Sequence, residues 1–203
     1  MAKESYHHGN LKEALIDSGL QILKEEGISA LSLRSAARRA GVSHSAPYAH
    51  FTSKNALLAA ITTQGFLRLH ADLEGTAADN QGSAEELLLE TAWAYAHFAL
   101  AEPALFKLMF SGILEDEHAY PEYMAAARST YQHLVEVVAH CQTAGVLKTG
   151  PAEESAIAIW SVVHGFIVLY RERQFPGHLV NKARLKTILK KTLEHLTLQA
   201  PGS

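Results

Sequence analysis

The residues with the clearest chemical potential lie between Leu31 and Leu58, in the stretch LSLRSAARRAGVSHSAPYAHFTSKNALL. Small residues, a glycine and a valine come first, and short polar side chains, a tyrosine, histidines and a lysine follow. Hydroxyl, imidazole and ammonium groups donate hydrogen bonds to phosphate oxygens and to base edges. The stretch therefore offers the chemistry of DNA recognition.

The same stretch has the layout of a helix-turn-helix, whose second helix enters a DNA groove. Ser32 is predicted to cap a helix from Leu33 to Ala40, and Gly41 is predicted to end it. Ser43 is predicted to cap a recognition helix that carries His44 to His50. On the turn alone, an ordinary helical hairpin without a role in DNA binding remains an alternative.

The residues after the turn separate these alternatives. Tyr48, Phe51 and Lys54 precede a leucine pair in the spacing Y-x-x-F-x-x-K-x-x-L-L. Together with the preceding A-x-x-A-G-V-S, this pattern over residues 10–60 resembles the TetR family of bacterial repressors. The start YHHGNL, the stretch GVSHSAPYAHF and a late W, H and G resemble the subgroup whose C-terminal domain is called WHG. Those three residues are Trp160, His164 and Gly165.

The resemblance implies DNA contacts for eight residues. The first two would meet phosphate at the start of the first motif helix, the next three would face the groove, and the last three would contact backbone phosphates. Phe51 and Leu57 are expected in the core. Two departures concern Pro47, which a short helix tolerates only in its first turn, and Ala49, where related sequences often carry arginine. The eight are Ser32, Arg34, Ser43, His44, Ser45, Tyr48, His50 and Lys54.

Composition and periodicity favour an all-helical protein. The 203 residues are 48% hydrophobic and 19% charged, which fits a folded chain, and only six prolines interrupt it. Apolar residues recur at helical spacing, without strand-like alternation of any length. About nine helices are predicted, three short and six longer. The longer ones cover residues 10–26, 53–73, 84–101, 123–144, 153–173 and 182–198, and a short one begins at Pro103.

Two domains are expected. The N-terminal helix-turn-helix domain, of three helices, is assigned to residues 1–55 and a larger C-terminal regulatory and dimerisation domain to residues 56–203. The clearest break in composition is GTAADNQGS at residues 75–83, so a structural seam is expected on or near it. The net charge is −3, yet residues 1–55 carry seven Lys and Arg against five Asp and Glu. A basic head on an acidic body fits a regulator that touches phosphate with one end.

The C-terminal domain is predicted to form a homodimer and to hold a small apolar effector. By resemblance, the helices at 153–173 and 182–198 pair with their symmetry mates, and two heads then read the half-sites of a palindromic operator. Aromatic, methionine and polar residues at helical spacing are candidates to line an effector pocket, with ordinary core packing as the alternative for each. They are Trp93, Phe98, Phe106, Met109, Phe110, Met124, Tyr131, Trp160 and His164.

Other function classes are not predicted. The sequence has no glycine-rich phosphate loop, no H-E-x-x-H and no nucleophile elbow, and its single cysteine, Cys141, excludes an internal disulfide. His97 and His164 are expected to be core histidines, and no metal, cofactor or enzymatic activity is predicted. No apolar stretch is judged long enough to cross a bilayer, and the start lacks the core of a signal peptide, so a cytoplasmic protein is expected.

The sequence therefore predicts a DNA-binding transcriptional regulator, most simply a repressor that a small apolar effector releases from double-stranded DNA. A helix-turn-helix regulator without an effector is the alternative. A helical enzyme or interaction module would show no salt-dependent affinity for DNA.

Overall fold

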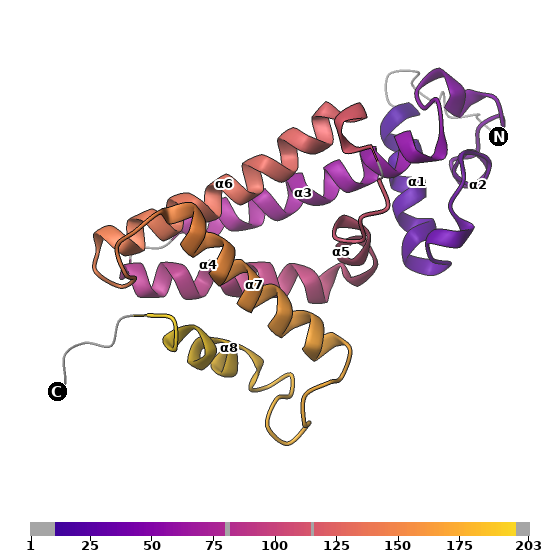
Figure 1. The fold of residues 1–203 in the computed structure, drawn as a ribbon. Coiled ribbons are helices and arrows are strands. Elements are labelled where there is room, and N and C mark those ends of the chain that lie inside the picture. The colour runs from indigo at the N-terminus through magenta and orange to yellow at the C-terminus, as the bar shows by residue number, and fades with distance from the viewer. Residues whose placement is uncertain (1–10, 80–81, 115, 198–203) are drawn as a thin grey trace. The chain divides into compact units, whose positions relative to one another are not determined.

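The computed structural model describes residues 11–79, 82–114 and 116–197, and every regular element in these ranges is helical (Figure 1). The predicted all-helical class is confirmed, with eight α-helices and three short 3₁₀ helices. They are α1 (Leu11–Glu25), η1 (Ile28–Ala30), α2 (Leu33–Arg39), η2 (Ala46–Ala49), α3 (Lys54–Asp79), α4 (Ala84–Ala101), α5 (Pro103–Met109), η3 (Glu117–Ala119), α6 (Pro121–Thr143), α7 (Ala152–Arg171) and α8 (Leu185–Glu194). Most of the YHHGNL start lies outside the described residues.

The helices pack into two compact units. Unit 1 comprises residues 1–67 and 104–127, and unit 2 comprises residues 68–103 and 128–203. Helices α3 and α6 each contribute residues to both units.

The core of unit 1 is formed where α1 meets the first half of α3. Leu15, Ile22 and Leu57 are almost completely buried. Gly19 lies on the same face of α1, and a Cβ added there would come within 2.6 Å of the Ile61 Cδ1 atom. The absence of a side chain at Gly19 therefore lets α1 approach α3 closely.

The core of unit 2 is formed by α4, α7 and α8, which contact one another. Helix α8 buries Leu185, Leu189 and Leu193, which recur at every fourth position and so share one face of the helix. On α7 the buried face is formed by Ala156, Ile159, Val163, Phe166 and Ile167.

Three predicted boundaries differ from the structure. Helix α3 extends beyond its predicted end at residue 73 to Asp79, within the expected seam, and Thr76 donates its hydroxyl hydrogen to the Asp72 carbonyl at 2.9 Å. Helix α6 begins at Pro121, two residues earlier than expected, because proline is favoured in a first turn. Helix α8 begins only at Leu185, since the preceding residues form a turn in which the Arg184 N–H donates to the Asn181 carbonyl.

One further expectation is wrong. The sequence was expected to contain no apolar stretch long enough to cross a bilayer, but helix α7 is long and apolar enough for this by length and composition alone. Only 28% of its apolar window is buried within the chain. Core helices of soluble proteins can share this length and composition.

Candidate nucleic-acid interface

The turn after α2 has the geometry that the sequence predicts. Gly41 has φ +70°, a left-handed conformation that favours glycine. Its N–H donates to the Arg38 carbonyl at 3.2 Å, and the Val42 N–H donates to the Ala37 carbonyl at 3.0 Å. These two bonds form a Schellman motif, which satisfies the last carbonyls of the helix. Gly41 therefore ends α2 and directs the chain into the second motif helix.

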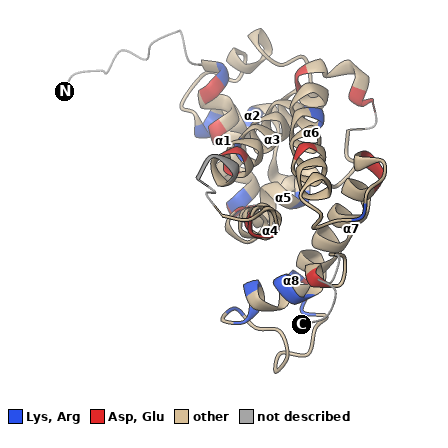
Figure 2. Ribbon diagram, turned by 90° about the vertical axis from the view of Figure 1, so that its left-hand side faces the viewer, with Lys and Arg blue, Asp and Glu red and all other residues tan. Residues whose placement is uncertain are grey.

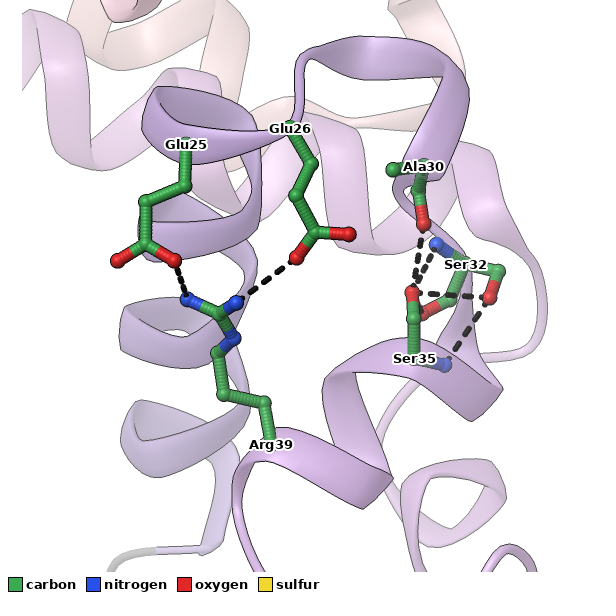
Figure 3. Close-up of polar contacts among 6 residues, drawn as sticks. All are labelled: Glu25, Glu26, Ala30, Ser32, Ser35 and Arg39. Carbon is green, nitrogen blue, oxygen red and sulfur yellow. Dashed lines mark hydrogen bonds and ion pairs between the residues drawn. The ribbon is translucent and has the colours of Figure 1, made fainter.

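The start of α2 is held by a capping box between two serines (Figure 3). The Ser35 N–H donates to Ser32 Oγ at 3.0 Å, and the Ser32 N–H donates to Ser35 Oγ at 2.8 Å. Ser35 Oγ also donates to the Ala30 carbonyl at 2.8 Å. The predicted cap at Ser32 is confirmed, and the partner Ser35 was missed because capping boxes usually carry Glu or Gln at that position.

Arg39 fixes the end of α2 to the end of α1 (Figure 3). Its guanidinium donates to Glu25 Oε2 at 2.5 Å and to Glu26 Oε1 at 2.8 Å. The pKa of Arg39 is raised above its usual value, and the hydrogen bond to Glu25 is the largest cause. Arg39 is thus engaged within unit 1, although it and the neighbouring Arg38 are both exposed.

The second motif helix is shorter than predicted. Only Ala46–Ala49 are helical, as one 3₁₀ turn, and no side chain caps this turn, so the predicted cap at Ser43 is wrong. Pro47 has no N–H and cannot donate to the Ser43 carbonyl as an α-helix would require. That carbonyl accepts from the Ala46 N–H at 3.0 Å instead. Pro47 lies in the first turn, as predicted, and is buried.

The predicted recognition residues form an exposed surface around this turn. Ser43, His44, Ser45 and His50 are all exposed, and Ser43 Oγ lies 3.2 Å from Ser45 Oγ. Tyr48 has 56% of its surface exposed. The exposed Tyr48 side chain presents a hydroxyl that can donate a hydrogen bond to a phosphate oxygen.

The hydrophobic residues behind this surface are core, as predicted. Phe51 is 2% exposed and Leu57 is 0% exposed. They anchor the exposed turn to α3 from the inside. Ala49 is exposed but too short to supply the phosphate contact that an arginine would make.

Lys54 is the first residue of α3 and is exposed. Ser53 Oγ caps this helix by accepting from the Ala56 N–H at 3.1 Å. Lys54 Nζ donates to the Ile28 carbonyl at 3.2 Å. An ammonium group carries three hydrogens, so this bond positions the charge and leaves donors for phosphate.

The charge around this surface is more one-sided than the total over residues 1–55 suggests. Between Gly27 and Leu67, within unit 1, the chain contains no Asp or Glu and four Lys or Arg residues. Figure 2 marks the two charge types in blue and red. Arg34 is one of the four and is exposed on the first turn of α2. A stretch whose charged residues are all cations favours binding to the phosphate backbone of DNA. This absence of carboxylates is visible in the sequence alone.

In unit 2, two of the predicted effector residues take part in a hydrogen-bond chain between α4 and α7. Trp160 Nε1 donates to Tyr95 Oη at 3.1 Å, and Tyr95 Oη lies 2.7 Å from His164 Nδ1. An indole N–H can only donate, so Tyr95 Oη accepts from Trp160 and shares a second hydrogen bond with the imidazole of His164. Burial lowers the pKa of His164 and favours its neutral form.

The other candidates of unit 2 surround this chain or lie on α4. The Tyr131 ring is 6.1 Å from the Trp160 ring, and Phe98 is buried. Lys186 Nζ lies 5.6 Å from the centre of the Trp93 ring. His97 is exposed beside Trp93, so the expectation that it is a core histidine is wrong.

The remaining four candidates belong to unit 1. Phe106 and Phe110 have ring centres 4.9 Å apart. Met109 is buried, and its sulfur packs against Gly65 so closely that a Cβ added to Gly65 would lie 2.7 Å from it. Met124 is half-buried. The nine predicted lining residues therefore fall into two groups in different units. Pockets of about 260 Å³ and 760 Å³ on unit 2 are lined by other residues.

The fold and the exposed motif define a class, that of helix-turn-helix proteins. Residues 15–61 match the family described as bacterial regulatory proteins, tetR family. Residues 88–195 match the family described as tetracyclin repressor-like, C-terminal domain. The chain belongs to the TetR family of transcriptional regulators, and its function is DNA-binding regulation of transcription. The C-terminal match is consistent with the predicted WHG subgroup.

Individual relatives are similar to this chain over most of their length. The uncharacterized HTH-type transcriptional regulator YvkB of Bacillus subtilis (strain 168) is 25% identical over 160 residues, which cover 76% of this chain and 79% of YvkB. A structure of a protein with unknown function from Rhodococcus sp. RHA1 is 32% identical, with a TM-score of 0.83 over 97% of this chain and 100% of that one. A bacterial regulatory protein in the tetR family from Rhodococcus RHA1 is 22% identical, with a TM-score of 0.70 over 93% and 97%.

Proposed function

We propose that the protein is a repressor that binds a palindromic operator as a homodimer and leaves it when a small apolar effector binds. Residues 1–55 would hold the DNA-binding function and residues 56–203 the regulatory and dimerisation functions. A protein of this kind acts where the bacterial chromosome lies, in the cytoplasm. The observation that carries the proposal is the exposed turn of η2, bordered by cations and free of carboxylates.

We assign the DNA contacts to this surface residue by residue. The exposed side chains of Ser43, His44 and Ser45 precede η2 and would face the groove, where short polar groups reach base edges. Arg34 and Lys54 would bind phosphate from either side. Their contacts would fix the register of the turn on the duplex. Tyr48 and His50 would contact backbone phosphate, and Ser32 would add a weaker contact because its Oγ already accepts from the Ser35 N–H.

The outer face of α7 supports the homodimer. Ile157 and Leu169 are 55% and 44% exposed, although both are large and apolar. Ser161 and Gly165 lie between them at every fourth position, and beyond the adjoining backbone of α7 a Cβ on Gly165 would meet no atom of the described residues within 4 Å. A stripe with apolar ends and a small centre is suited to a close helix–helix contact. We propose that a second copy covers it and that α8 completes the interface.

The effector function is supported by the course of α3. This single helix carries Lys54 at its start and continues to Asp79, so it contributes to both compact units. An effector that binds one orientation of α3 better than another would change the affinity of the head for DNA.

The experiment begins by selecting bound duplexes from a random pool with the full-length protein, followed by titration of the selected sequence. We expect a two-fold symmetric sequence, affinity that falls with salt, and weaker binding in the presence of some members of a panel of small apolar compounds. Absence of salt-dependent binding would reject the assigned interface. Affinity unchanged by every compound would leave a regulator without an effector, the alternative function.

A further inference from the structure

Two histidines of unit 2 have buried ring nitrogens without a hydrogen-bond partner. They are His70 on α3 and His133 on α6, and the nitrogens are His70 Nδ1 and His133 Nε2. Burial of an unpaired acceptor or donor costs free energy, so such atoms are rare in folded proteins. The pair calls for a chemical explanation.

The other nitrogen of each ring is engaged by oxygen. His70 Nε2 lies 3.3 Å from Glu74 Oε1 and 3.4 Å from Ser129 Oγ. His133 makes a hydrogen bond to the backbone of Leu73. In a neutral imidazole the nitrogen that donates to oxygen carries the hydrogen, so the buried nitrogen of each ring presents a lone pair.

The environment also keeps His133 neutral. Burial is the largest cause that lowers its pKa, and the charge of His70 acts in the same direction, while the carboxylates of Glu136 and Glu74 oppose it. A neutral imidazole whose far N–H donates to an oxygen is the form in which histidine binds metal ions in proteins.

The separation of the two rings fits one shared ion. Their centres are 5.9 Å apart and their planes cross at 88°. Two imidazoles bound to one Zn²⁺ with ordinary bond lengths have ring centres about 5 to 6.5 Å apart. The His70 side chain is 21% exposed, so its ring lies at the edge of the core although its Nδ1 atom is buried.

We propose that His70 and His133 form a binding site for a borderline transition-metal ion such as Zn²⁺ or Ni²⁺. The described residues contain no group of three or more His, Cys, Asp and Glu side chains placed to hold a metal, so water completes the coordination. Glu74 orients the His70 ring through its contact with His70 Nε2. Nitrogen ligands favour Cu²⁺, Ni²⁺ and Zn²⁺ over Mg²⁺. The site is separate from the proposed DNA contacts.

The test is calorimetric titration of the full-length protein with ZnCl₂, NiCl₂ and MgCl₂. The chain has twelve histidines, and others among them can also bind these ions. The relevant quantity is therefore the affinity of the one site that is lost in both His70→Gln and His133→Gln. His140→Gln is the matched control, because His140 is exposed on α6. We expect each of the first two variants to weaken the same site at least tenfold, with no change in the control and no competition by MgCl₂.

A second variant protects the test from misfolding. Glu74 is exposed, so Glu74→Gln leaves the fold intact and is expected to weaken Zn²⁺ binding about tenfold by releasing His70. Zn²⁺ should also raise the melting temperature of the wild type more than that of any of the three variants. Equal Zn²⁺ affinity in wild type and all three variants, or binding that Mg²⁺ displaces, would overturn the proposal.

Discussion

Replacing Tyr95 with phenylalanine removes one oxygen atom that joins α4 to α7. Trp160 Nε1 donates to this oxygen at 3.1 Å, and His164 Nδ1 lies 2.7 Å from it. Tyr95 itself is 7% exposed, so its ring stays buried in the variant. Each partner that loses a buried hydrogen bond costs about 1–3 kcal/mol. Because Trp160 and His164 are half-buried and water reaches them in part, we expect about 1 kcal/mol for each, or about 2 kcal/mol in all.

The assay is urea denaturation of wild type and variant at one protein concentration. In a thermal melt, the same loss of about 2 kcal/mol would correspond to a fall in melting temperature of about 4–8 °C for a chain of this length. Tyr48→Phe is the matched control, because Tyr48 is 56% exposed and its replacement should change stability by less than about 0.5 kcal/mol. A Tyr95→Phe variant as stable as this control would refute the argument that the chain of hydrogen bonds holds α4 and α7 together.

Three further predictions concern the cap, the dimer and pH. Ser35→Ala removes half of the capping box and should cost about 1 kcal/mol in urea denaturation; an unchanged midpoint would contradict this. Gly165→Leu should shift sedimentation towards monomer, whereas a dimer as tight as wild type would place the interface elsewhere. The free energy of unfolding should fall as pH drops below 6.5, because the folded chain lowers the pKa values of His133 and His164 and the unfolded chain therefore binds more protons. A stability that is constant from pH 7 to 5 would count against both shifts.

Local signals in the sequence were sufficient for most of the fold. Ser32 and Gly41 mark the two ends of α2 because their effects on the backbone depend on neighbouring residues alone. Helix α4 begins and ends where predicted. The second motif helix and α8 were overestimated, because helical periodicity continues through residues whose N–H groups bond in a 3₁₀ turn or a tight turn instead.

The sites were less predictable, because their partners are distant in the sequence. His70 and His133 come from different helices and meet only in the folded chain. The same is true of Tyr95 and His164, so Tyr95 carried no signal of its role. The exposed position of Tyr48 and its neighbours was easier to predict, since these residues are consecutive in one motif.

The most direct measurement of the central claim is the affinity of the full-length protein for its selected duplex after Tyr48→Ala and Lys54→Ala. Both side chains are exposed, so the fold should remain intact, which circular dichroism checks. We expect each variant to weaken binding about tenfold, and loss of Lys54 to reduce the slope of log affinity against log salt by about 1. Lys107→Ala, an exposed lysine on α5, is the control and should bind as wild type does. Native affinity in both variants would contradict the assignment of this surface to DNA.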